Sequence, residues 1–440
     1  MNVKNISGAQ SLIIIFIFTS LLTRFDFPFS LFFIFSIVYS ILYLLPKLLD
    51  VNGWKKQSYI LVLHYLILVY LATILLVHKL LDLNFNSFPH FWEAKSTLAF
   101  MSIIFVNIVV LKTSENNIIK TLEFFKKISY FIIIESIIFF ILPSSIGIFQ
   151  SDFEAGYRFT STLTPGYIMT GFFLILGYTS YLHLNLSKSK YKIFFIFLLF
   201  CFALIQTKDR TSILTFLAIN FFVLYKSASS KILIYGVFKK FSFLLKVALM
   251  LSIVFFSMQH FGERKDFMSF SSVLDRYVLL IRGVNVAKET LPFGGGPGSQ
   301  IRLMFSDKIP FNQRIDIVGN FKEVKYKSRA SISLKEDFNY SKEYLRKRVG
   351  SGKTMSPHNT YMDFTISLGL LGILIVISIL LFQCKSLIRL TINQDSHNYY
   401  IYAMFVSSFV LLMNSSLITS IWLFIIMYKV LQVSKVQVKL

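Results

Sequence analysis

The sequence has few charged residues and little cysteine. Only 15% of its 440 residues are Asp, Glu, Lys or Arg, whereas 55% are hydrophobic and the mean hydropathy is +0.64. A soluble domain of this length needs more polar surface, which excludes an ordinary soluble enzyme. Of the two cysteines, Cys201 lies in an apolar run and Cys384 just after one, and they suggest neither a disulfide framework nor a metal site. The composition predicts a membrane protein.

The hydrophobic residues form continuous runs. Ile13–Phe18 and Phe194–Phe202 lack the alternation of apolar and polar positions that strands of a membrane barrel require. Because backbone polar groups in lipid must be satisfied within the chain, these runs predict helices. We therefore expect an all-α, polytopic membrane protein of about 12 transmembrane helices, at roughly 20 residues a span. The candidate spans centre on residues 8–23, 28–46, 58–78, 97–112, 128–144, 165–184, 193–207, 211–226, 243–259, 359–382, 398–413 and 416–431.

Acidic residues are scarce, at 22 against 45 Lys and Arg, a formal charge of +23. With a cytoplasmic N-terminus, the inner segments hold 21 basic residues and the short outer loops hold 6, which predicts that both termini are cytoplasmic. The other 18 lie in an outer loop at 259–357, beside 10 acidic residues, so that loop carries +8. Long loops are exempt from this charge rule. The charge therefore either attracts an anionic substrate or belongs to a solvated loop that is basic by chance.

These features divide the chain into three parts. Residues 1–258 are expected to form a bundle of helices 1–9, residues 259–357 an extracytoplasmic loop, and residues 358–440 helices 10–12. Apolar residues at helical spacing from Ser271 onward predict an amphipathic helix that ends at Pro292. The segment 299–355 is interpreted as a soluble excursion, with a polar helix at Leu334–Val349. Glu135, inside a span, has either a functional role or a hydrogen bond between helices.

Four arginines on the expected outer side could bind an anion. Arg158 precedes the sixth span and Arg210 lies in the turn between the seventh and eighth. A guanidinium matches phosphate in a two-pronged geometry, although interfacial anchoring and ordinary turn polarity remain open for these two. Arg276 and Arg282 lie on the amphipathic helix, about 120° apart around its axis. One of that pair could therefore be structural.

Two short motifs belong to the outer loop, one within it and one at its end. The glycine-rich run at 294–298 permits a tight reversal or a close approach of backbone to a ligand. It lacks the Lys and Ser/Thr that would follow in a Walker loop. The segment Ser356–Tyr361 opens the tenth expected span and contains His358. A neutral histidine at the membrane surface is either a general base near pH 7 or a capping residue.

Together, these residues resemble the O-antigen polymerase and O-antigen ligase superfamily. The resemblance covers roughly Arg158 to Gly372 and includes family-like positions at Arg158 and Arg210. One departure is Ser367, because ligase-like members often have Glu there, two residues before Gly369; this favours a polymerase. The motifs that carry the resemblance are Arg276, Pro292–Gly298, Pro357–Tyr361 and Gly369–Gly372.

The resemblance implies a metal-independent glycosyltransferase of the GT-C type, without a cofactor, in the bacterial cytoplasmic (inner) membrane. Its donor would be a glycan on undecaprenyl diphosphate, and its acceptor the sugar hydroxyl of another lipid-linked repeat unit of O-antigen, capsule or exopolysaccharide. A chain-length regulator is a further candidate partner, and nucleic acid is not. Expected roles are catalysis for His358 and Arg276, diphosphate binding for Arg158, Arg210 and Arg282, and loop structure for Gly294, Gly296, Gly298, Asn359 and Tyr361.

Two alternatives differ in what is transferred. An O-antigen-type ligase would move a finished glycan to a non-repeating acceptor, and its motifs hardly differ from those of a polymerase. A flippase or exporter of lipid-linked sugars would need a path of charges through the membrane and a small outer loop. The sequence instead has few ionisable residues inside its expected spans and a large outer loop.

Overall fold

The structure is a computed structural model that describes part of the chain. It describes residues 8–22, 31–48, 102–103, 105–110, 113–142, 158–185, 190–228, 270–296, 299, 303–304, 313–315, 338–340, 359–392, 398–414 and 421–437. The expected spans at 58–78 and 243–259 lie outside these residues. Helical residues are present at each of the other expected positions.

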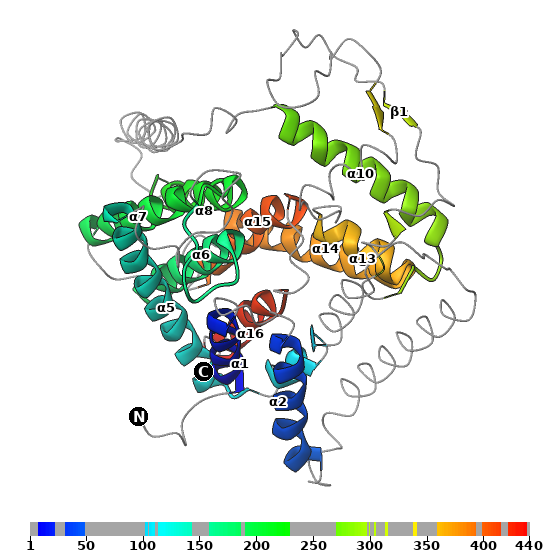
Figure 1. The fold of residues 1–440 in the computed structure, drawn as a ribbon. Helices are drawn as coiled ribbons and strands as arrows, with labels where there is room; N and C mark the ends of the chain where they lie inside the picture. Colours follow the sequence, from blue (N-terminus) through cyan, green and yellow to red (C-terminus); the bar gives the residue numbers. More distant parts are fainter. Residues whose placement is uncertain are drawn as a thin grey trace.

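The described helices lie in one assembly, with α10 to one side beside α13 (Figure 1). Two of them, α6 and α14, are long and apolar enough to cross a membrane by length and composition. The apolar window of α6 is 83% buried and that of α14 only 17%, so α6 is central and α14 peripheral. The helices are α1 Gly8–Leu22, α2 Leu31–Leu48, α5 Glu115–Ile141, α6 Tyr167–Leu184, α7 Lys190–Thr207, α8 Arg210–Ala228, α10 Phe270–Thr290, α13 Thr360–Leu368, α14 Leu370–Ile392, α15 Tyr399–Asn414 and α16 Ile421–Gln437.

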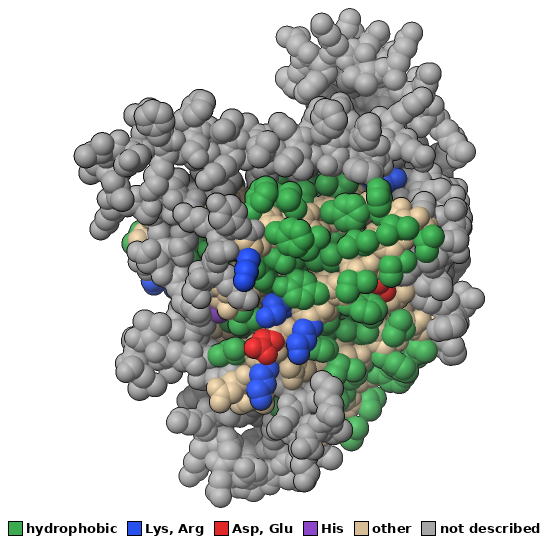
Figure 2. All heavy atoms as spheres, turned by 90° about the vertical axis from the view of Figure 1, so that its left-hand side faces the viewer, with side chains coloured by type: hydrophobic (Ala, Val, Ile, Leu, Met, Phe, Trp, Pro, Cys, Tyr) green, Lys and Arg blue, Asp and Glu red, His purple; other side chains and the backbone are tan. Residues whose placement is uncertain are grey.

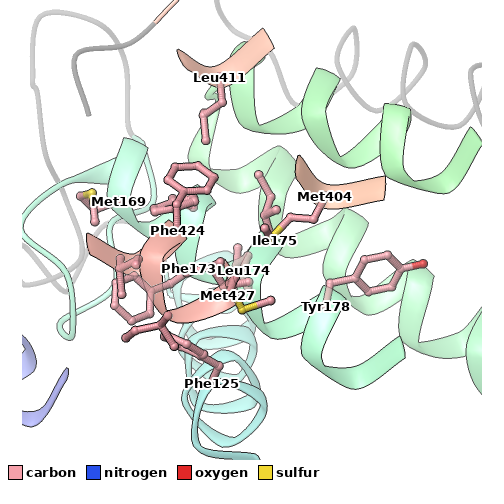
Figure 3. Packing of buried hydrophobic residues seen from close by; sticks show 14 of the residues in the cluster. Phe125, Met169, Phe173, Leu174, Ile175, Tyr178, Met404, Leu411, Phe424 and Met427 are labelled. Carbon is pink, nitrogen blue, oxygen red and sulfur yellow. The ribbon is translucent and has the colours of Figure 1, made fainter. Parts of the chain in front are cut away.

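The main core surrounds α6, which is buried on every side because nearly all of its residues are apolar or small. Figure 3 shows side chains of α5, α6, α15 and α16 meeting there. Phe172 packs on Phe424 with ring centroids 4.8 Å apart, and Phe173 stacks on Phe16 of α1 at 5.3 Å. Aromatic pairs at these separations add to the dispersion energy of close packing.

The face formed by α5 and its neighbours is largely apolar. Figure 2 shows hydrophobic side chains over much of it, with one group of basic side chains around an acidic one and a few isolated charged side chains elsewhere. Phe131, Ile134 and Ile141 of α5 are exposed, and so are Phe194 and Phe195 of α7. Exposed side chains of this size on adjacent helices suit contact with lipid better than contact with water.

The all-α expectation needs a small correction. Strand β1, Gln313–Ile315, pairs antiparallel with strand β2, Phe338–Tyr340, and Arg314 lies opposite Asn339. The polar helix predicted over Leu334–Val349 is therefore wrong at 338–340. Alternation of Phe338, Asn339 and Tyr340 fits a strand, and the partner segment is too distant in the sequence for local periodicity to reveal it.

The tenth expected span, 359–382, is not one continuous helix. The hydroxyl of Tyr361 donates to Gln383 Oε1 at 3.1 Å, although an uninterrupted helix would separate the two positions by about 33 Å. The chain reverses at Gly369, where φ is +57°, so that α13 folds back alongside α14. A Cβ on Gly372 would overlap the carbonyl of Phe364, which explains how the two helices approach so closely.

The end of α10 is joined to this reversal through backbone contacts. The N–H groups of Gly295 and Gly296 donate to the carbonyls of Ile366 at 2.8 Å and Ser367 at 3.0 Å. In return, the N–H of Leu370 donates to Pro292 O at 2.8 Å. A small second core between α10 and α13 supports the junction; it consists of Leu279, Val286, Ala287, Leu303, Met304 and Ile366.

We predict that Gly369→Ala lowers the free energy of unfolding, with backbone strain alone costing roughly 1–3 kcal/mol. Its Cβ would also lie 2.6 Å from the carbonyl carbon of Phe293. Thermal unfolding in detergent measures the effect. The matched control is Gly166→Ala, because a Cβ there meets nothing within 4 Å. Equal melting temperatures for the two variants would contradict the tight junction.

Candidate functional site

The segment before α6 that carries Arg158 is held by neighbours on two helices. The N–H of Phe159 donates to Gln206 O in the last turn of α7 at 2.9 Å. The ring of Phe159 is buried against Phe139 of α5, with centroids 5.6 Å apart. The segment is thus packed into the bundle, although its sequence resembles a surface loop.

Glu135 of α5 provides a further contact with this segment. Its two carboxylate oxygens accept hydrogen bonds from the hydroxyls of Ser161 and Thr162, and the side chain is only 4% exposed. The sequence left open a hydrogen bond from Glu135 to another helix, and these two bonds go instead to the segment that precedes α6. Glu135 does accept hydrogen bonds, from the segment that follows Arg158.

Arg158 is itself buried, at 6% exposure, and its guanidinium lies 4.3 Å from the centre of the Tyr167 ring. Among the residues that the structure describes, its Nε has no hydrogen-bond partner. Within the same described part of the chain, the side-chain Nε2 of Gln206 likewise lacks a partner. Buried donors are ordinarily satisfied, so unpaired donors on two hydrogen-bonded segments favour a ligand that supplies oxygen acceptors.

Arg210 is the first residue of α8, in the turn after α7. Asp209 caps that helix: its carboxylate accepts from the N–H groups of Thr211 at 3.3 Å and Ser212 at 3.2 Å. The turn lies close to α6, because a Cβ on Gly171 would be 2.7 Å from the Cβ of Ser212. Arg158 and Arg210 thus belong to neighbouring segments at one end of the bundle.

The same end receives the start of α13. Helices α8 and α15 pack along much of their length, and the hydroxyl of Tyr399 donates to Phe222 O at 2.9 Å. These two helices are therefore antiparallel. Counting about 1.5 Å a residue, Met413 of α15 lies about level with Arg210. Asn359, which precedes α13, reaches Met413 Sδ with its Nδ2 at 3.7 Å.

Asn359 and Tyr361 have structural contacts here. Asn359 Oδ1 accepts from the N–H groups of Tyr361 at 3.0 Å and Met362 at 3.1 Å, so it caps α13. Tyr361 bonds Gln383, whose Nε2 donates to Phe405 O of α15 at 3.3 Å. Both residues orient the segment that directly follows His358. His358 itself lies outside the described residues.

On α10, Arg282 is fully buried, and its Nε donates to Met304 O at 3.0 Å. Of the two arginines on α10, this contact favours a structural role for Arg282. The structure describes only the backbone of Arg276, in α10. Gly294 and Gly296 adopt positive φ at +80° and +90° in the junction with α13, whereas Gly298 lies outside the described residues.

Two of these contacts could not be located from sequence. Nothing in the sequence linked Glu135 to residues 26 and 27 positions later, or Gln206 to Phe159. Asp209 had a detectable signal, since Asp followed by Arg, Thr and Ser is a common start of a helix. Within the described part of the chain, no group of three or more His, Cys, Asp or Glu side chains could hold a metal ion.

The fold and site define a helical protein with membrane-spanning character and buried cationic and amide donors at one end. Residues 195–377 match the family model described as O-antigen ligase. The match confirms the resemblance and supports membership of the O-antigen polymerase and ligase superfamily, which consists of glycosyltransferase-like enzymes of the bacterial inner membrane. It includes Arg210, the α10 junction and α13, while Arg158 and Glu135 precede it. Searches of the curated proteins and of the solved structures found no match.

We predict that Asn359→Ala costs about 1 kcal/mol of folding free energy, because the first N–H groups of α13 lose their acceptor. Asn359→Ser keeps a capping oxygen and should retain most of that stability. Thermal unfolding of both variants in the same detergent distinguishes them. If the serine variant is as unstable as the alanine variant, the cap is not what Asn359 contributes.

Proposed function

We propose that this protein is a polysaccharide polymerase. It transfers a growing glycan from undecaprenyl diphosphate to a sugar hydroxyl of another lipid-linked repeat unit of O-antigen, capsule or exopolysaccharide. The observation that carries the proposal is the buried Arg158, whose Nε lacks a partner among the described residues and which lies beside the turn of Arg210. The family match makes an anionic, lipid-linked donor the appropriate ligand for such an arginine.

The chemistry needs a site for a diphosphate leaving group. A hydroxyl of the acceptor sugar attacks the anomeric carbon, and the bond from that carbon to the diphosphate oxygen breaks. The hydroxyl proton passes to His358, and inversion at the carbon is expected from direct displacement. Arg158, Arg210 and Arg276 stabilise the negative charge that develops on the diphosphate, in place of a metal ion. Arg282 is better suited to holding residues 303–304 against α10, given its hydrogen bond to Met304.

In this proposal the enzyme is of the GT-C type, with about twelve spans and both termini in the cytoplasm. The site then faces the extracytoplasmic side, where the polyprenyl chain remains in lipid while its glycan extends into water. The antiparallel order of α8 and α15 supports a common end for Arg210 and the start of α13. A chain-length regulator is the further partner that we propose.

A polymerase is favoured over a ligase by Ser367. This residue is fully buried, and its carbonyl accepts from the N–H of Gly296. A carboxylate in its place, as ligase-like members often have, could assist His358; serine cannot do so as a base. The ligase remains the second candidate, because the family match includes the name of that activity.

We predict that His358→Ala, Arg276→Ala and Arg158→Leu each leave the protein in the membrane but abolish chain lengthening. The matched control is Arg389→Leu, because Arg389 is an exposed arginine in the last turn of α14. The measurement uses purified protein with lipid-linked repeat units and no divalent metal, followed by separation of products by length.

The product pattern separates the alternatives. A ladder of lengths from the native protein supports a polymerase, whereas a single transfer that needs a different acceptor identifies a ligase. Full-length polymer from both the His358 and the Arg276 variants would contradict the proposed mechanism. Absence of product with either acceptor would restore the transporter hypothesis.

A further inference from the structure

Glu135 is a buried carboxylate that the proposed transfer reaction does not use. It lies in the C-terminal part of α5, six residues before that helix ends, in a region otherwise rich in Ile and Phe. Burial of a carboxylate among apolar side chains is costly unless hydrogen bonds compensate for lost water. A carboxylate at this position therefore suits a role that an apolar residue cannot fill.

We propose that Glu135 is a positioning residue for Arg158. By binding the hydroxyls of Ser161 and Thr162, it holds the segment that follows Arg158 against α5, so that the guanidinium is presented to the donor diphosphate. This inference rests on the proposed function, because it assigns to Arg158 the diphosphate of the lipid-linked donor.

The chemistry of the contact suits a carboxylate. Two hydroxyls on consecutive residues both donate, and a carboxylate has two oxygens that accept without donating. The Ser161 hydroxyl is also fixed from the other side, because its Oγ accepts from the N–H of Leu163 at 3.1 Å. The Ser161 hydroxyl therefore accepts from Leu163 and donates to Glu135.

Other contacts hold different parts of the same segment. The N–H of Ser161 donates to Thr170 Oγ1 of α6 at 3.1 Å, and Thr164 and Thr170 share a hydroxyl–hydroxyl bond of 2.6 Å. The Phe159 backbone is bonded to α7. Glu135 thus joins the side chains of the segment to α5, while hydrogen bonds to α6 and α7 involve mainly its backbone.

A direct role for Glu135 as a base fits this geometry poorly. Both of its oxygens already accept hydrogen bonds from hydroxyls, and the side chain is 4% exposed. A base must reach the proton that it removes from the acceptor sugar. Glu135 acts instead through Arg158, which lies three residues before Ser161.

The test compares Glu135→Leu with Glu135→Gln. A glutamine can accept from Ser161 with its carbonyl oxygen and donate to Thr162 with its amide, so it retains two contacts without the charge. The matched control is Ser136→Ala, because Ser136 is the next residue on α5, is fully buried and bonds only locally, to Ile133 O at 2.7 Å, among the contacts that the structure shows for it. Binding of undecaprenyl diphosphate is titrated in nanodiscs, and polymerisation rates are measured in parallel.

We expect Glu135→Leu to raise the Kd for undecaprenyl diphosphate about tenfold, which corresponds to ~1.4 kcal/mol. Glu135→Gln should remain within about threefold of the native protein, and Ser136→Ala should not differ from it. Native-like binding by Glu135→Leu would overturn the inference. An equal loss in the glutamine and leucine variants would also overturn it, because the charge, and not the hydrogen bonds, would then matter.

Arg158→Leu, titrated alongside, distinguishes failure of this inference from failure of the proposed function. If Arg158→Leu weakens binding and Glu135→Leu does not, only the positioning role is wrong. If neither does, the assignment of Arg158 to the diphosphate is wrong as well. Should Glu135→Leu fail to fold, Ser161→Ala with Thr162→Val removes the same two hydrogen bonds from the other side. That double variant must reproduce the loss of binding.

Discussion

The approach of two glycine-containing segments, 292–296 and 366–370, is the constraint on which the arrangement of α10, α13 and α14 depends. The backbones exchange three hydrogen bonds there, and a Cβ on either Gly294 or Gly369 would overlap the opposite chain. Because of this junction, α10 is attached to the reversal between α13 and α14. The reversal in turn sets the direction of α13, whose first residues follow His358. Close packing and backbone hydrogen bonds at this junction, and not charged groups, therefore orient α13.

The remainder of the site depends on polar groups satisfied inside an apolar bundle. Glu135, Asp209 and Asn359 all accept hydrogen bonds near helix ends, from hydroxyls or from the first N–H groups of a helix. Each of these contacts fixes a segment beside a residue with a proposed chemical role. Polar groups buried in a membrane must be hydrogen-bonded within the protein. The hydrogen bonds that satisfy them here also position the groups that are proposed to bind the donor.

Buried donors without a partner distinguish Arg158 from Arg282 on physical grounds. Both side chains are almost inaccessible, yet Arg282 Nε bonds a carbonyl oxygen while Arg158 Nε has no partner among the described residues. An arginine whose Nε donates to a carbonyl within the protein stabilises the fold. One whose buried Nε has no acceptor in the described protein can bind a ligand that supplies one. Both residues are arginines, and the family resemblance implied diphosphate binding for both. Only their contacts in the structure distinguish their roles.

The sequence alone predicted a helical membrane protein, the positions of most of the described helices and the resemblance to the O-antigen polymerase and ligase superfamily, because long apolar runs and short motifs are local properties of the chain. It also identified Arg158, Arg210 and the glycine-rich turn as notable. Tertiary structure decided what no local pattern contains: the reversal at Gly369 within an apparently continuous apolar run, the pairing of 313–315 with 338–340, and the contact of Glu135 with Ser161 and Thr162. The physical reason is that each of these depends on which distant segment fills the space beside it.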